Sequence, residues 1–260
     1  MSPSESKRIL VIPDTQVRPD VPLEHLDWLG LALVDYRPDI VVHIGDHFDM
    51  PSLSKYESPG SAYMEGKRIL NDIATGNEGF ARLNAPMAAE IARRREKHRK
   101  RWEPRRVFLM GNHENRIVRA VHEEPKLDGL LSLDMLKVPE GWETHPFLEI
   151  VEIEGILFSH YFSNTQSGKA IGGSIDNRLN RIGRSFVMGH QQGLLYGIRQ
   201  FPGSLMRHGL VCGSFYQHDE HYRDAQSNGE WRGIVVLNEV RDEGYDIMPL
   251  SMNYLRRRYS

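Results

Sequence analysis

Five short polar clusters in this chain carry side chains of the kind that hold metal ions. The donors are carboxylate, amide and imidazole groups, and they are Asp14, Gln16, Asp46, Asn112, His160, His190 and Gln192. Oxygen and imidazole-nitrogen donors without thiolate suit Mn, Fe, Zn, Mg or Ni rather than a soft-metal site. Two such ions about 3.5–4 Å apart clamp a phosphoryl group and lower the pKa of a bound water, which becomes the nucleophile. Chemistry of this kind needs no Ser, Cys or Thr nucleophile.

Each polar cluster follows a short apolar run that is typical of a buried strand. The runs are rich in β-branched or aromatic residues, stop at a turn former, and span 8–12, 39–44, 107–110, 155–158 and 185–188. Between the first two runs, residues 23–36 have apolar positions at helical spacing, and Pro38 marks the exit. This alternation predicts an α/β fold with a partly parallel sheet. Ligands bind beyond the carboxyl ends of such strands, so we expect the five clusters to converge.

The rest of the chain predicts two further features within a single domain of residues 1–260. The stretch from about 50 to 105 is too long for a simple connection, and we interpret it as an inserted helical cap. Its second half has apolar residues on one helical face, at Phe80, Leu83, Met87 and Ile91. Strand patterns at 205–214, 233–240 and 245–252 predict a second, more antiparallel sheet packed on the first.

In order along the chain, the polar clusters resemble the motifs of the calcineurin-like metallophosphoesterase superfamily. The family pattern is D-x-H, G-D-x-x-D, G-N-H-[DE], H and G-H-x-H. The matching stretches are Asp14-x-Gln16, Gly45-Asp46-x-x-Asp49, Gly111-Asn112-His113-Glu114, His160 and Gly189-His190-x-Gln192. Each piece alone is a weak signal, but together they cover residues 8–192. The resemblance implies a four-layered αββα sandwich of two mixed β-sheets and a phosphoesterase that depends on metal ions.

The resemblance also implies two metal sites of unequal strength. One would be formed by Asp46, Asn112, His160 and His190, which all match the family pattern. The other would use Asp14, Gln16, Gln192 and the shared Asp46. Both glutamines stand where the family usually has His, and a neutral amide oxygen is a weaker donor than imidazole for late first-row metals. We therefore expect two divalent ions, with Mn favoured and the Asp14/Gln16/Gln192 site the weaker.

Four more residues gain roles from the same motifs. His113 matches the family's general acid, which protonates the leaving oxygen, and Asp49 matches the carboxylate that orients this histidine. Arg116 follows closely, and we expect it to contact a phosphate oxygen of the substrate. His47 lies inside the second motif at a variable position, and we interpret it as facing solvent or substrate.

The residues after Asp49 bear on the substrate class. Serine/threonine protein phosphatases of the superfamily have Arg-Gly there, whereas this chain has Met50-Pro51. The chain looks more like the branch of small phage and bacterial phosphoesterases that is similar to DNA-repair exonuclease subunits. We expect a phosphodiesterase that acts on nucleic acid or a nucleotide. A phosphomonoesterase, a non-catalytic module that binds metal and phosphate, and a nucleic-acid-binding protein stay open as alternatives.

Charge and composition add expectations about partners and location. The formal net charge is -2, yet residues 93–106 hold nine Arg or Lys and two Glu, so this basic stretch is a candidate contact for DNA or RNA. No apolar run approaches the ~20 residues that span a bilayer, and the start of the chain lacks the pattern of a signal peptide. We expect a cytoplasmic protein with no membrane partner, in the host cytoplasm if a phage encodes it. Its single cysteine, Cys212, cannot form an intrachain disulfide.

Overall fold

The chain forms an α/β structure with two mixed β-sheets, as the sequence predicted. The computed structural model describes residues 5–55, 64–203, 205–219 and 229–260. The six-stranded sheet has the order β11 (Gly244–Ser251), β10 (Gly233–Arg241), β1 (Lys7–Ile12), β2 (Ile40–His43), β3 (Arg105–Leu109) and β4 (Trp142–His145). The five-stranded sheet has the order β5 (Val151–Ile153), β6 (Ile156–Ser159), β7 (Phe186–Met188), β9 (Leu205–Cys212) and β8 (Leu194–Phe201). Strands β1 to β4 run parallel, as do β6, β7 and β9.

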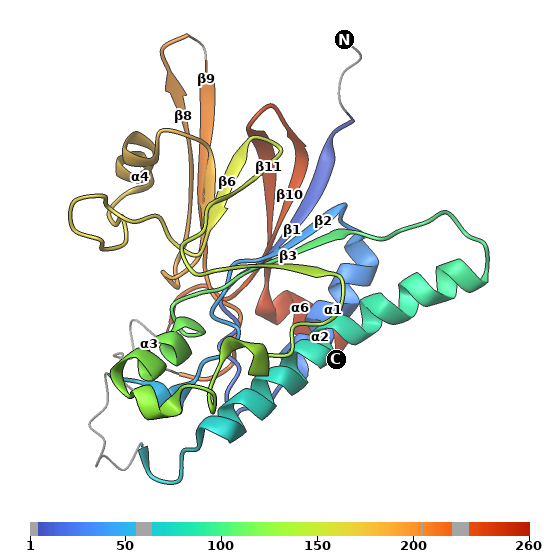
Figure 1. Cartoon of the computed structure of the whole chain (residues 1–260). Coiled ribbons are helices and arrows are strands. Elements are labelled where there is room, and N and C mark those ends of the chain that lie inside the picture. The colour runs from blue at the N-terminus through green and yellow to red at the C-terminus, as the bar shows by residue number, and fades with distance from the viewer. Residues whose placement is uncertain (1–4, 56–63, 204, 220–228) are drawn as a thin grey trace.

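Helices pack on the outer face of each sheet (Figure 1). They are α1 (Glu24–Tyr36), α2 (Ile69–Glu96), α4 (Ile175–Ile182) and α6 (Met252–Tyr259). Helix α3 (Asn115–Glu123) contacts the short 3-10 helices at Pro51–Leu53 and Pro125–Leu127, and another 3-10 helix spans Leu133–Met135. Helices α1, α2 and α6 share a hydrophobic cluster with the six-stranded sheet, and α4 shares one with the five-stranded sheet. Within the described part of the chain, no helix is long and apolar enough to cross a membrane.

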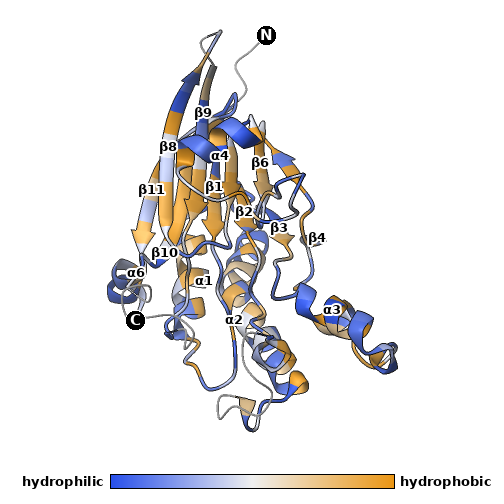
Figure 2. Ribbon diagram, turned by 90° about the vertical axis from the view of Figure 1, so that its left-hand side faces the viewer, coloured by the Kyte–Doolittle hydropathy of each residue, from blue (hydrophilic) through white to orange (hydrophobic). Residues whose placement is uncertain are grey.

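The alternation of side chains along each strand decides which layer each residue meets. In β1, Leu10 and Ile12 pack with the helices, whereas Ile9 and Val11 pack against the other sheet. All four side chains are fully buried. Figure 2 shows the hydrophobic colour concentrated on the strands. The two sheets therefore stack face to face with helices outside, and this arrangement holds the strand ends of both sheets at fixed places.

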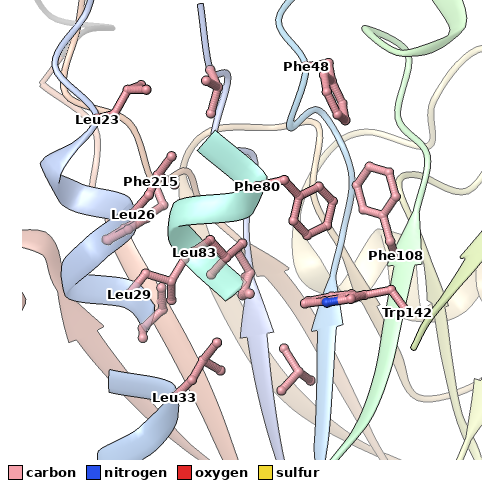
Figure 3. Packing of buried hydrophobic residues seen from close by; sticks show 14 of the residues in the cluster. Leu23, Leu26, Leu29, Leu33, Phe48, Phe80, Leu83, Phe108, Trp142 and Phe215 are labelled. Carbon is pink, nitrogen blue, oxygen red and sulfur yellow. The ribbon is translucent and has the colours of Figure 1, made fainter. Parts of the chain in front are cut away.

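The helix predicted in the second half of the 50–105 stretch is α2, and it belongs to the layer over the six-stranded sheet. Its residues Phe80, Leu83 and Met87 are fully buried in the cluster that also contains the leucines of α1. Figure 3 shows the Phe80 ring beside Phe108 and Trp142, with ring centroids 5.2 and 5.1 Å away. The structure thus shows a helix built into the core and does not show a separate cap.

The C-terminal strands differ from the sequence prediction in their sheet membership. Strand β9 does lie in the second sheet, but β10 and β11 extend the first sheet, with β10 antiparallel to β1. Alternate residues of β10 face the helices (Ile234, Val236) and the other sheet (Val235, Leu237). A strand buried on both faces fits either sheet equally well by its own pattern, so its neighbours decide its place.

Acid is expected to destabilise the fold through the buried His25 of α1. Burial, with the nearby His218, lowers the pKa of His25 to about 3 from an ordinary value of 6.5. Below that ordinary value the unfolded chain binds a proton that the folded chain does not, so the free energy of unfolding falls as pH falls. His25 alone should contribute about 2 kcal/mol of this loss between about pH 7 and about pH 5.

Urea unfolding at several pH values measures this contribution of His25. A His25→Gln variant should show a flatter dependence of unfolding free energy on pH, whereas His122→Gln, at an exposed position on α3, should follow the wild type. Equal slopes for the wild type and His25→Gln would contradict the assignment.

Candidate metal centre

The loops that follow five strands meet at one end of the two sheets. Each loop carries one of the predicted donors, in the order Asp14 after β1, Asp46 after β2, Asn112 after β3, His160 after β6 and His190 after β7. Backbone hydrogen bonds tie the loops together, from Gln16 N to Asp46 O at 2.9 Å and from Gly189 N to His160 O at 3.0 Å. Parallel strands in both sheets thus bring segments from five parts of the sequence to one place.

Four side chains form a compact group of the metal-ligand type. One ligand atom from each of Asp46, His160 and His190 lies within 4.8 Å of the others. Asn112 Oδ1 lies 2.9 Å from His160 Nε2 and 2.7 Å from His190 Nδ1. Asp46 Oδ2 lies 3.3 Å from the same His160 Nε2. Asp46 and His160 are buried, whereas Asn112 and His190 are half-buried and line a surface pocket, so the group is accessible from outside.

A hydrogen bond at Nδ1 orients the ring of His160. Nδ1 donates a hydrogen bond to Ile44 O at 2.9 Å, which leaves Nε2 facing Asp46 and Asn112. Burial lowers the pKa of His160, but the charge and hydrogen bond of Asp46, the charge of Asp14 and the bond to Ile44 O together outweigh it and raise the pKa to about 9. The surroundings of His160 Nε2 therefore favour a positive charge at this point, which a proton on His160 or a metal ion can supply.

Two buried oxygens in the loop after β1, which is bonded to the Asp46 and His190 loops, lack any hydrogen-bond donor among the described residues. They are Asp14 Oδ2 and Gln16 Oε1, in side chains that are 0% and 3% exposed. A buried acceptor without a partner costs about 1–3 kcal/mol, so this donor set fits a second cation. Burial raises the pKa of Asp14 to about 7, against the opposing charge of His160. Gln192 is also buried and lies in the loop of His190.

The backbone is strained at three of these positions. The φ angles are 38° at Gln16, 50° at Asp46 and 64° at His190, in the left-handed region that residues with a Cβ seldom adopt. A neighbouring glycine is also required by space, because a Cβ on Gly111 would lie 2.1 Å from Asp46 Oδ1. The loops therefore hold their donors in conformations that regular turns would not produce.

His113 is placed beside the metal-ligand group and paired with Asp49. Its backbone N donates to Asp46 Oδ1 at 2.8 Å, and its Nδ1 donates to Asp49 Oδ1 at 2.7 Å. This leaves Nε2 on the side of the site, 3.6 Å from Asp46 Oδ2. Burial lowers the pKa of His113, but the charges of Asp46 and Asp49 outweigh it, so the pKa lies above its ordinary value.

Two buried arginines surround Asp49 and His113. Arg116 Nη1 donates to Asp49 O at 2.8 Å and to Met50 O at 3.2 Å, and its Nη2 lies 3.0 Å from His113 Nε2. The structure thus places Arg116 at the site, but with its donors directed at the protein. Arg18 Nη1 lies 3.5 Å from Asp49 Oδ2. Sequence reasoning did not identify Arg18, because it lies outside the motifs and approaches only in the fold.

Glu114 is a second residue to which sequence reasoning assigned no role. It is fully buried and accepts three backbone hydrogen bonds, from Asp46 N at 3.0 Å, Phe48 N at 2.8 Å and Gly111 N at 2.7 Å. These bonds join the loop after β2 to the loop after β3. The acidic fourth position of the G-N-H-[DE] motif was the available signal, since a carboxylate can accept several N–H groups at once.

His47 lies behind the site rather than on a surface that could meet solvent or substrate. Its side chain is fully buried, and its Nε2 donates to Gly76 O of α2 at 3.0 Å. Its Nδ1 accepts from Thr15 Oγ1 at 2.8 Å, and Thr15 in turn accepts from His43 Nε2 at 3.2 Å. His43 Nδ1 accepts from Gly45 N at 3.3 Å. Both ring nitrogens of His47 are occupied, so the structure assigns it to a chain of bonds that joins the β1 and β2 loops to α2.

Comparisons with known proteins add little to this geometry. No protein-family model matches the chain, and no curated protein matches it. Among solved structures, a phosphoesterase from E. coli, Yfce, is similar with a TM-score of 0.38 and 12% sequence identity, over 95% of this chain and 100% of that chain. The conclusions about this chain therefore rest on its own residues and their arrangement.

Proposed function

We propose that this chain is a metal-dependent phosphoesterase. The proposal rests on the group of Asp46, Asn112, His160 and His190, in which two imidazole nitrogens face two side-chain oxygens at distances from 2.7 to 3.3 Å. Imidazole nitrogens and side-chain oxygens gathered in this way are a ligand set that suits a divalent metal ion such as Mn, Fe or Zn. The five motifs that resemble the calcineurin-like metallophosphoesterases support the same reading, including a four-layered αββα sandwich.

The ligand set supports two ions of unequal affinity. Asp46, Asn112, His160 and His190 would hold the stronger one, and Asp14, Gln16, Gln192 and Asp46 the weaker. When bound, the ions neutralise charge on phosphoryl oxygens and lower the pKa of a water. The chain itself sets the orientation of the donors, through Ile44 for His160 and Glu114 for the Asp46 loop. Mn is the favoured metal, because two amide oxygens at the weaker site suit a harder ion.

His113 is the proposed proton donor to the leaving oxygen. Asp49 accepts the proton on Nδ1, so a proton that His113 transfers would be carried on Nε2, the nitrogen that accepts from Arg116 Nη2 in this structure. Arg116 lowers the pKa of His113 while Asp46 raises it, and cations bound to Asp46 would weaken the raising charge. Both effects favour release of the proton when the leaving group needs it. Asp49 and Arg116 act as positioning residues, since each contacts His113 directly.

A phosphodiester, in nucleic acid or a nucleotide, is the proposed substrate class. The resemblance to the small phage and bacterial branch supports it, as does the lack of the Arg-Gly pair of protein phosphatases after Asp49. A phosphomonoester is the alternative that the same chemistry would serve.

The 93–106 basic stretch is proposed as a second contact for DNA or RNA. Arg95 and Arg99 line a surface groove of about 480 Å³ at the end of α2. The rise of a helix puts Arg95 about 28 Å from Gly76, which is at the back of the metal centre. Only a long substrate can reach both places. Other arginines of this stretch are paired, as Arg94 is with Glu90, so its free charge is smaller than the sequence suggests.

The test is turnover of bis(4-nitrophenyl) phosphate and 4-nitrophenyl phosphate with Mn and other divalent ions, each with a chelator control. We expect turnover that appears with Mn, is lost in chelator, and is faster for the diester. Faster monoester hydrolysis would replace the diesterase with a phosphomonoesterase. Phosphate binding without metal-stimulated turnover of either ester would replace the enzyme with a binding module.

A further inference from the structure

A pocket of about 440 Å³ opens directly beside the candidate metal centre. Two residues of the centre, Asn112 and His190, contribute to its lining. The remaining lining residues come from α3, from the connection between β4 and β5, and from the loop after β6, and they are Asn115, Arg116, Arg119, Phe147, Tyr161, Gly168, Lys169 and Ala170. None of these lining residues is acidic, so the pocket is cationic and lies where a substrate extends away from the reacting phosphate.

One wall of the pocket is aromatic. The rings of Phe147 and Tyr161 are in edge contact, with centroids 5.5 Å apart. The Tyr161 ring also lies 4.7 Å from the ring of His190, which links this wall to the metal centre. Both Phe147 and Tyr161 are half-buried, so part of each ring remains open to a ligand. Ring surfaces of this kind bind unpaired nucleobases by stacking, whatever the base.

Two exposed cations flank the same pocket. Arg119 and Lys169 form no ion pair with any described residue, and both side chains are exposed. Arg116, in contrast, directs its donors to Asp49, Met50 and His113. The position of Lys169 is set by a short turn in which Asn164 N donates to Lys169 O at 2.8 Å.

We propose that this pocket binds the nucleotide next to the scissile bond in a single nucleic-acid strand. Its base would lie against Phe147 and Tyr161, and its outer phosphate would lie between Arg119 and Lys169. The inference rests on the proposed phosphoesterase function and names the substrate of that site. A phosphotyrosyl peptide would also place a ring in the pocket, but it has no second phosphate for the two cations, whereas a nucleotide strand has one at every residue.

Binding of a fluorescent thymidine oligonucleotide of about eight nucleotides tests the pocket. It is measured by anisotropy with Mn, with every variant built on His113→Ala so that the strand is cut much more slowly than binding equilibrates. Arg119→Gln/Lys169→Gln should weaken binding and reduce the slope of log affinity against log salt by about 0.7, from the loss of one neutralised phosphate. Phe147→Leu/Tyr161→Leu should weaken binding at least about fivefold, from lost stacking. Arg241→Gln/Arg257→Gln, which removes two exposed charges from β10 and α6, should leave both quantities unchanged.

The results separate this inference from the proposed function. If the wild type hydrolyses bis(4-nitrophenyl) phosphate with Mn, but the Arg119/Lys169 variant binds the strand with unchanged affinity and salt slope, the pocket assignment is overturned and the phosphoesterase stands. A phosphotyrosyl peptide that displaces the strand at lower concentration than an unlabelled oligonucleotide would also overturn it, as would a duplex that binds as tightly as the single strand. Without turnover of any phosphoester, the proposed function itself fails.

Discussion

Asp46→Asn is expected to lower Mn-stimulated hydrolysis of bis(4-nitrophenyl) phosphate at least about 1000-fold, because metal ions contribute several kcal/mol to such reactions. Asp46 is the single carboxylate in the group with Asn112, His160 and His190. Its replacement leaves two imidazoles and two neutral amides, which do not balance the charge of a divalent ion. Metal content by mass spectrometry and initial rates at saturating Mn are the measurements.

Asp128→Asn provides the matched control for this loss. Asp128 is exposed and follows the 3-10 helix at Pro125–Leu127, so the same change of charge there should leave both metal content and rate at the wild-type level. An Asp46→Asn protein that kept more than about a tenth of the wild-type rate would show that the chemistry does not take place at this group.

His113→Ala should lower turnover by about 100-fold or more while metal content stays unchanged. The loss should depend on the leaving group. Nitrophenolate leaves without much help from a proton, whereas the alkoxide of a nucleoside needs one, so the loss should be larger for a dinucleotide than for bis(4-nitrophenyl) phosphate. Rates on both substrates, with metal analysis of each preparation, measure this difference.

The partner of His113 offers a graded comparison. Asp49→Asn keeps the size of the side chain that contacts His113 Nδ1 at 2.7 Å but removes its charge. The expected loss is about 10-fold, between the wild type and His113→Ala, as for other groups that orient a functional histidine.

An equal loss for both substrates in His113→Ala would remove the proton-donor role and leave His113 as a residue that only supports Asp46.

The sequence was sufficient to predict the strands that carry the site. Each of the five apolar runs is a buried strand, and each polar cluster lies in the loop after it, because burial on both faces and a turn former leave little choice of structure. The sheet membership of β10 was beyond such reasoning. Val235 and Val236 are adjacent residues buried on opposite faces, and nothing in their pattern distinguishes β1 from β9 as a neighbour.

Within the site, residue type and spacing predicted which residues lie close together better than they predicted which atoms those residues contact. Asn112, His160 and His190 do come together around one oxygen. The direction of a flexible side chain was not predictable, and Arg116 turns its guanidinium to Asp49 O and His113. The burial of His47 depends on α2, a helix far along the chain whose Gly76 O accepts its proton. Contacts of that kind exist only after tertiary packing.

The left-handed backbone at Gln16, Asp46 and His190 has a consequence for how this sequence changes over generations. Each such residue costs about 1–3 kcal/mol, a considerable part of the 5–15 kcal/mol that hold a typical domain folded. Glycine would relieve each position, so any lineage freed from selection for activity gains stability by mutating these residues first. Asp and His tolerate this conformation better than Gln does. If relatives keep Gln16, Asp46 and His190 despite this cost, that conservation would therefore measure selection for the site rather than for the fold.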